Sequence, residues 1–133
     1  MVEFSEVERK FLVENEICRV ATLSADNTPA VVPVCFAFLD NLFYFATDYN
    51  TRKYKNLEHN KNVAIIVDVY NSPDNRAVAI RGRAKFIERG AVFKRLYDIF
   101  YLKFDWVRQD PWSDGEAPFI QVTPTHKSSW GLE

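Results

Sequence analysis

The feature that most constrains the fold is a pair of apolar runs separated by two turn-forming residues. Residues 30–39 are rich in Val and Phe, Asp40 and Asn41 follow directly, and residues 42–47 return with three more aromatic side chains. Asp and Asn tolerate the positive φ angles that a two-residue hairpin turn requires. The pattern therefore predicts a tight antiparallel hairpin.

Two prolines lie in the first arm of this hairpin, Pro29 at its start and Pro33 in its middle. Proline has no backbone N–H to donate to a neighbouring strand. Pro33 therefore indicates an edge strand, a bulge, or a place where a ligand meets the backbone.

Further strand-like and helix-like segments accompany the hairpin. Strands are predicted over residues 18–24, 63–70, 77–88 and 119–123, and helices over residues 5–15, 50–60 and 91–104. Ser5 and Glu8 match a capping box, Gly82 indicates a bulge, and residues 105–118 are expected to form a loop. Because the strands do not alternate regularly with helices, we predict a mainly β (α+β) fold, a six-stranded antiparallel barrel with flanking helices.

Composition narrows the function classes. A chain of 133 residues fits one domain spanning 1–133, and its net charge of −1 argues against a nucleic-acid partner. Cys18 and Cys35 form no CxxC pair and are expected to be buried, reduced thiols. His59 and His126 are isolated, so no metal site is predicted. The absence of a long apolar run predicts a cytoplasmic protein without a membrane partner.

A candidate anion site follows the second hairpin arm. Thr51, Arg52 and Lys53 open the predicted helix 50–60, where unpaired backbone N–H groups and the positive end of the peptide dipoles face outward. A hydroxyl, a guanidinium and an ammonium at that point suit a phosphate monoester. The alternative is an ordinary helix with Asn50 or Thr51 as its N-cap and two solvated charges. No nucleophile elbow, dinucleotide-binding glycine motif or P-loop is present, which leaves a phosphorylated aromatic cofactor such as a flavin.

The order of these segments resembles a known family. The runs RVATL (19–23), DNTPAVVPV (26–34), LFYFAT (42–47), TRKYKNLEHN (51–60) and AIRGRA (79–84) together resemble the pyridoxamine 5′-phosphate oxidase-related, FMN-binding split-barrel superfamily. The resemblance covers roughly residues 5–130. It implies a split barrel, a bound FMN, a small-molecule substrate, and a homodimer with two shared cofactor sites.

The resemblance also implies cofactor-binding residues, position by position. Thr51, Arg52 and Lys53 would bind the FMN phosphate, and the strand end at Phe45, Ala46 and Thr47 would touch the ribityl chain and ring. The neighbouring strand would face the isoalloxazine through Val32, Pro33, Val34 and Cys35. Arg81 would approach the ring or phosphate from the partner strand, and Trp130 would close the pocket across a dimer interface. No catalytic residue is implied.

Two departures from the family pattern bear on activity. Pyridoxamine oxidases carry an arginine on the strand that here contains residues 31–34, and a C-terminal Arg-x-His element where this chain ends Trp-Gly-Leu-Glu. A vitamin oxidase is therefore not expected. The predicted function is a flavin-dependent oxidoreductase acting on an unknown small molecule. The alternatives are a reductase that uses an 8-hydroxy-5-deazaflavin coenzyme, and a non-catalytic flavin carrier, storage or sensor module.

Overall fold

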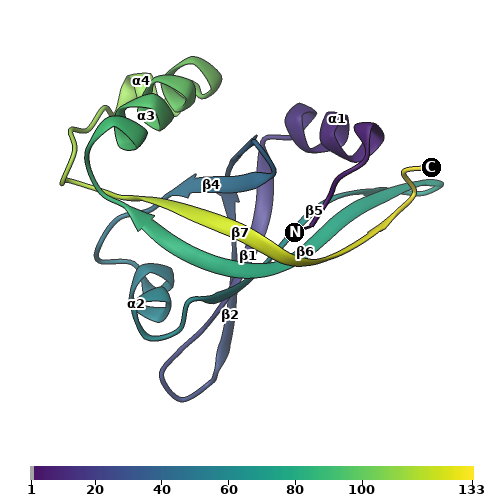
Figure 1. Ribbon diagram of the computed structural model, residues 1–133, viewed down its shortest axis with the longest axis horizontal. Coiled ribbons are helices and arrows are strands. Elements are labelled where there is room, and N and C mark those ends of the chain that lie inside the picture. Colours follow the sequence, from purple (N-terminus) through teal and green to yellow (C-terminus); the bar gives the residue numbers. More distant parts are fainter. Residues whose placement is uncertain (1) are drawn as a thin grey trace.

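The computed structural model describes residues 2–133 (Figure 1). In chain order the elements are α1 (Glu6–Glu14), β1 (Ile17–Leu23), β2 (Pro29–Cys35), β3 (Ala37–Leu39), β4 (Leu42–Ala46), α2 (Arg52–His59), β5 (Asn62–Asn71), β6 (Asp74–Ile87), α3 (Ala91–Lys103), α4 (Asp105–Gln109) and β7 (Phe119–Trp130). All strands are antiparallel and form one sheet in the order β2-β1-β5-β6-β7-β4-β3. Within the described residues the sheet has seven strands rather than the predicted six.

The additional strand arises because the run 30–39 breaks at Phe36. The Phe36 side chain is fully buried, and its backbone N–H donates to the Glu16 carbonyl at 3.0 Å instead of to a neighbouring strand. The chain therefore passes directly from β2, at one edge of the sheet, to β3, at the other edge. A sheet whose two edges are joined by one residue must curl on itself. The predicted fold class, a mainly β split barrel with flanking helices, is confirmed.

The predicted turns are present at the hairpins. Asp40 and Asn41 have φ angles of 52° and 68°, and Leu39 pairs with Leu42 across the turn between β3 and β4. Two successive positive φ angles match the right-handed twist of the strands that they join. The β2 strand pairs with β1 alone, which makes it an edge strand, and this explains how it accommodates two prolines.

The predicted bulge lies where β6 meets β7. Arg81 pairs with His126 and Gly82 pairs with Pro124, so Thr125 is the extra residue on β7. A Cβ atom on Gly82 would lie 2.4 Å from the Thr123 carbonyl oxygen, so glycine is required by the close approach of the two backbones. Beyond the bulge β7 continues to Trp130, seven residues past the predicted end at residue 123.

Two hydrophobic clusters hold the elements together. One fills the barrel, and Phe36, Phe43, Phe45 and Leu57 are fully buried in it. The other lies under α3 and α4, which cover the ends of β4, β6 and β7. The α4 helix corrects the expected loop 105–118, whose first part is helical. Of the helices among residues 2–133, none has the length and apolar character needed to cross a membrane.

The predicted capping box at the start of α1 also ties this helix to β7. The Ser5 N–H donates to Glu8 Oε1 at 2.8 Å, and the Glu8 N–H donates to Ser5 Oγ at 3.1 Å. The buried Glu8 carboxylate further accepts hydrogen bonds from Lys127 Nζ at 2.7 Å and from Ser129 Oγ at 2.5 Å. Burial alone would raise the pKa of Glu8, but these hydrogen bonds outweigh burial and lower it.

Candidate functional site

The first turn of α2 is held in place by two threonine hydroxyls. Thr51 is the N-cap: its Oγ1 accepts a hydrogen bond from the Tyr54 N–H at 3.3 Å and donates to the Asp48 carbonyl at 2.9 Å. The hydroxyl of Thr47 lies 2.8 Å from that of Thr51. Both hydroxyls thus stabilise the turn that precedes the helix. Thr51 acts as the ordinary N-cap that was the alternative interpretation of this segment.

Two backbone donors remain at this helix start. The N–H groups of Arg52 and Lys53 occupy the first two helical positions, where no carbonyl of the same helix can accept from them. Neither has an acceptor elsewhere in residues 2–133. Both N–H groups lie at the positive end of the α2 helix dipole, and this position favours the binding of an anionic group.

The side chains of Arg52 and Lys53 lie in two different hollows, one on each side of the α2 N-terminus. Consecutive helical residues are about 100° apart around the helix axis, which accounts for this divergence. The basic hollow, of about 920 Å³, is lined among others by Ser24, Asp26, Asn50, Arg52, Lys55 and His59. The tryptophan hollow, of about 380 Å³, is lined among others by Thr47, Asp48, Lys53, Trp106, Trp112 and Glu116.

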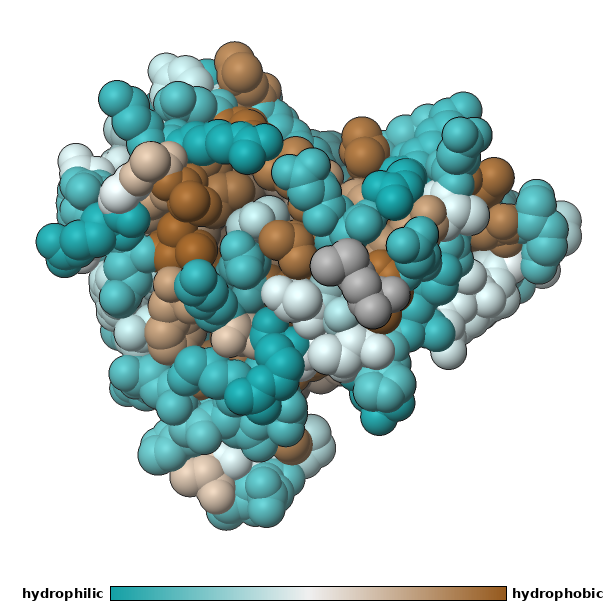
Figure 2. All heavy atoms as spheres, viewed as in Figure 1, coloured by the Kyte–Doolittle hydropathy of each residue, from teal (hydrophilic) through white to brown (hydrophobic). Residues whose placement is uncertain are grey.

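The basic hollow separates α2 from the turn between β1 and β2. The surface over α2 is largely hydrophilic, whereas apolar residues gather below α3 and α4 (Figure 2). The carboxylate of Asp26 is hydrogen-bonded within its own turn, to the Ser24 hydroxyl and to the Thr28 N–H. These hydrogen bonds, that of Ser24 foremost, lower the pKa of Asp26. No ion pair within residues 2–133 engages Arg52 or Lys55, so the hollow carries unpaired positive charge.

The tryptophan hollow combines one ammonium group with an aromatic wall and with three carboxylates, those of Asp48, Asp110 and Glu116. Lys53 is half-buried, and this burial lowers its pKa, partly opposed by the nearby Asp48 carboxylate. The rings of Trp106 and Trp112 are parallel within 3°, with their centroids 5.9 Å apart. Trp112 is fixed by a hydrogen bond of 3.2 Å from its Nε1 to the Ala117 carbonyl. Neither tryptophan is among the predicted site residues, because residues 105–118 carry no recognisable motif. Only the folded chain brings the two rings together beside Lys53.

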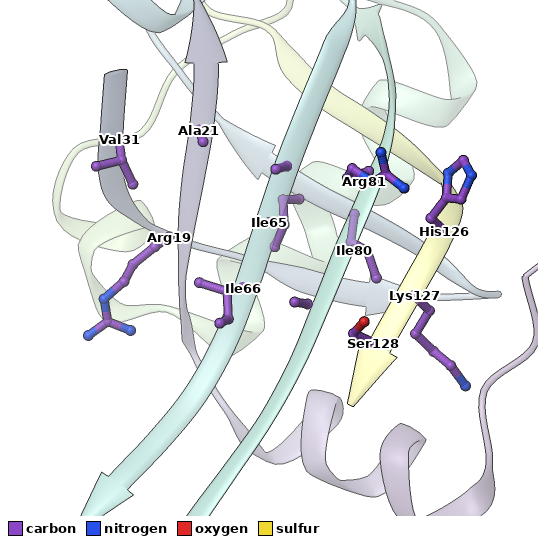
Figure 3. A pocket seen from close by; sticks show the side chains of 12 residues that line it. Arg19, Ala21, Val31, Ile65, Ile66, Ile80, Arg81, His126, Lys127 and Ser128 are labelled. Carbon is purple, nitrogen blue, oxygen red and sulfur yellow. The ribbon is translucent and has the colours of Figure 1, made fainter. Parts of the chain in front are cut away.

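A third hollow, the sheet groove, crosses β1, β5, β6 and β7 on their outer face (Figure 3). It has a volume of about 460 Å³, and small side chains of Ala21, Ala64 and Ala79 contribute to its lining. Arg81 and His126 pair across β6 and β7 on one side of the groove. Arg81 is thus absent from the lining of both hollows at α2, and His126 is its unpredicted neighbour.

The other predicted cofactor-binding residues are distributed unevenly. Ala46, Thr47, Thr51 and Lys53 come together in the tryptophan hollow. The edge strand β2 carries four of them, of which Val32 and Pro33 are exposed and Val34 and Cys35 are half-buried.

Two predicted residues lie elsewhere. The Phe45 side chain is fully buried in the barrel, so only its backbone is available to a ligand. The indole Nε1 of Trp130 donates to the Tyr70 hydroxyl at 2.5 Å. Trp130 is the last residue of β7, and the C-terminus that follows it lies across the molecule from α2 (Figure 1). One chain therefore does not bring Arg81 or Trp130 to the start of α2. In the described part of the chain, no three His, Cys, Asp or Glu side chains form a possible metal site.

Several solved structures share this fold. A FAD-binding protein from Mesorhizobium loti is 22% identical, with a TM-score of 0.73 over 95% of this chain and 94% of that chain. An F420 reductase is 24% identical, with a TM-score of 0.71 over 94% of this chain and 98% of that chain. The heme storage protein HutZ from Vibrio cholerae is 16% identical, with a TM-score of 0.77 over 90% and 89%. At these identities the likeness establishes the fold alone.

Sequence comparison is decisive for the family. No curated protein sequence matches this chain. The family model described as pyridoxamine 5′-phosphate oxidase, in contrast, matches residues 4–131. The chain therefore belongs to the pyridoxamine 5′-phosphate oxidase family.

Proposed function

We propose that this protein binds FMN through its phosphate at the start of α2 and acts as a flavin-dependent oxidoreductase on a small molecule. The observation that carries the proposal is the pair of free N–H groups at Arg52 and Lys53, flanked by the two cationic side chains of the same residues. Membership of the family supports it.

The donor set fits a phosphate monoester. Two backbone N–H groups at a helix start, one guanidinium and one ammonium would supply charge-assisted hydrogen bonds from different directions. Because Thr47 and Thr51 already hold the preceding turn, the donors are in place before a ligand arrives. The half-buried position of Lys53 reduces the solvent screening of its charge.

The edge strand β2 suits the other end of such a cofactor. Its backbone is paired with β1 on one side and unpaired on the other. The Phe36 N–H bonds to Glu16, so by alternation Val32 and Val34 face β1, while Val31, Pro33 and Cys35 turn their backbone carbonyls to the unpaired side, where a flat heterocycle could bind. Bound flavin would supply the electron and hydride chemistry. This chain would bind the phosphate, orient the ring and shield one wall of the site with Trp106 and Trp112.

We further propose a homodimer with shared cofactor sites. Arg81 and Trp130 lie outside the hollows at α2, so they could reach a flavin only on a second copy of the chain. The sheet groove offers that copy an apolar surface, with Val31 at its rim 66% exposed. Light scattering should give twice the 15.5 kDa of one chain, and a monomer that still binds FMN tightly would contradict the shared site.

The test of the phosphate site compares FMN with riboflavin, which lacks the phosphate. Flavin fluorescence titration should show that R52Q and K53Q each weaken FMN binding by about tenfold or more, because each removes a charge-assisted contact. Riboflavin binding should stay unchanged, and K94Q on the distant α3 is the matched control. Equal affinity of the original protein for FMN and riboflavin would exclude this phosphate site.

Two alternatives are separated by related measurements. The phosphate-bearing 8-hydroxy-5-deazaflavin coenzyme would suit the same donors, and an F420 reductase is among the structures that share this fold. Competition between this coenzyme and FMN decides which of the two is bound more tightly. Flavin binding without turnover on any pair of reductant and acceptor would instead indicate a carrier, storage or sensor module.

A further inference from the structure

We infer that the basic hollow binds the diphosphate group of a nucleotide, in addition to the flavin phosphate at the helix start. This inference rests on the proposed function only in assigning the start of α2 to a flavin. Of the basic side chains that line the hollow, Arg52 is shared with the proposed flavin phosphate site, whereas Lys55 and His59 are left unused by a flavin mononucleotide.

The arrangement of the basic side chains favours an extended anion. Arg52, Lys55 and His59 lie at positions i, i+3 and i+7 of α2, which places them on one face of the helix. At a rise of 1.5 Å per residue, they cover roughly 10 Å along the helix axis. One phosphate at the N-terminus would contact Arg52 at most, so Lys55 and His59 remain for further phosphate oxygens.

Among the described residues, the opposite wall forms no ion pair with these basic side chains. It is formed by the turn between β1 and β2, whose Asp26 carboxylate is hydrogen-bonded to Ser24 and Thr28 of the same turn. Its charge lowers the positive potential of the hollow without forming an ion pair with α2. An anion that enters the hollow therefore meets cations without first breaking salt bridges.

The hollow is also spacious and its base is fixed. Its volume of about 920 Å³ exceeds the 380 Å³ of the tryptophan hollow on the other side of the helix start. Asn56, which is 3% exposed, donates from Nδ2 to the Thr22 hydroxyl at 3.0 Å. This hydrogen bond holds α2 against β1, so the spacing of the two walls is set before binding.

Two sources could supply such a diphosphate: the cofactor itself, as a flavin adenine dinucleotide, or a nicotinamide dinucleotide that delivers electrons to a bound flavin. Both carry the same linked phosphates. The experiment therefore tests the diphosphate first and its source second.

Calorimetric titration with ADP, AMP and adenosine tests the site. ADP should bind about tenfold more tightly than AMP, because the second phosphate adds a charge-assisted contact, and adenosine should bind the least tightly. The variants K55Q and H59Q should reduce the preference for ADP, whereas K94Q, the same kind of change on α3, should leave it intact. Since Lys55 and His59 are exposed, these variants should fold normally.

The source is then identified with whole cofactors. If FAD binds more tightly than FMN and K55Q abolishes the difference, the hollow serves the flavin. If NADPH displaces ADP from the FMN-loaded protein, the hollow serves an electron donor. Either outcome supports the diphosphate site.

Failure of this inference differs from failure of the proposed function. FMN binding with equal affinities for ADP, AMP and adenosine would exclude the diphosphate site and leave the flavin site standing. ADP binding that is sensitive to K55Q, in a protein that ignores FMN, would exclude the flavin proposal alone. An ADP affinity unaffected by both K55Q and H59Q would place the nucleotide elsewhere and overturn the inference.

Discussion

Replacing Lys127 with Met should destabilise the protein by leaving a buried carboxylate without its cation. Lys127 Nζ lies 2.7 Å from Glu8 Oε1, and the Glu8 side chain is only 6% exposed. The same ammonium group also donates to the Glu3 carbonyl at 2.8 Å. The variant thus removes two hydrogen bonds that connect β7 to the N-terminal segment.

The size of the effect follows from what remains around Glu8. Removing one partner of a buried ion pair commonly costs about 3–5 kcal/mol. Here the Ser5 N–H and the Ser129 hydroxyl still donate to Glu8, which places the expected loss at the lower end, about 3 kcal/mol. For a chain of this length that loss corresponds to a decrease in Tm of about 10 °C.

The pH dependence identifies the carboxylate as the cause. The folded-state pKa of Glu8 is lowered, so Glu8 stabilises the original protein above its unfolded pKa, near the ordinary value of 4.5. That stability is lost as the pH falls through the lowered folded-state pKa. In the K127M variant, burial is no longer outweighed by Lys127 and should raise the pKa of Glu8. The loss in free energy of unfolding should therefore be largest at pH 7 and should become smaller below the ordinary pKa of a glutamate.

Urea unfolding at pH 7 and pH 4 measures both effects. The control is Lys10→Met, whose ion pair with Glu14 is 3.9 Å long between side chains that are 78% and 58% exposed. A pair this exposed should contribute less than about 1 kcal/mol. A loss for K127M no greater than that for K10M, or a loss equal at both pH values, would refute the assigned role of Glu8.

The remaining predictions concern backbone contact and side-chain ionisation. Gly82→Ala should cost about 2 kcal/mol or more in urea unfolding, because the new Cβ would lie 2.4 Å from a β7 carbonyl oxygen. Burial raises the pKa of Cys18 to about 12, so this thiol should resist alkylation at pH 8 in the folded protein. The half-buried Cys35 should react slowly, and mass spectrometry of the alkylated protein distinguishes the two cysteines. Burial, and then the hydrogen bond to Glu88, raise the pKa of Tyr49 to about 12. In an absorbance titration, the Tyr49→Phe variant should therefore show one fewer phenol ionising at high pH than the original protein. Identical titration curves for the two proteins would contradict this assignment.

Much of the site was predictable in outline but not in detail. The helix start at residues 51–53 was recognised because capping residues and unpaired N–H groups are local features. The division of Arg52 and Lys53 between two hollows was not, because it depends on what packs on each side of α2. Those walls come from residues 24–30 and 106–117, which are remote in the chain.

The sequence by itself determined the features that depend on residues a few positions apart. The capping box of Ser5 and Glu8 follows from local hydrogen bonding, and the Asp40–Asn41 turn follows from local backbone geometry. The ordered motifs also indicated the family that the match over residues 4–131 establishes.

Only the tertiary structure decided the features that depend on distant contacts. The break at Phe36 exists because β2 and β3 must reach opposite edges of the sheet, and a run of Val and Phe carries no local sign of that. The polar residues 124–130 extend β7 because β6 supplies their backbone partners. The hydrophobic pattern of a segment predicts which of its side chains are buried, but it does not predict which strand pairs with that segment.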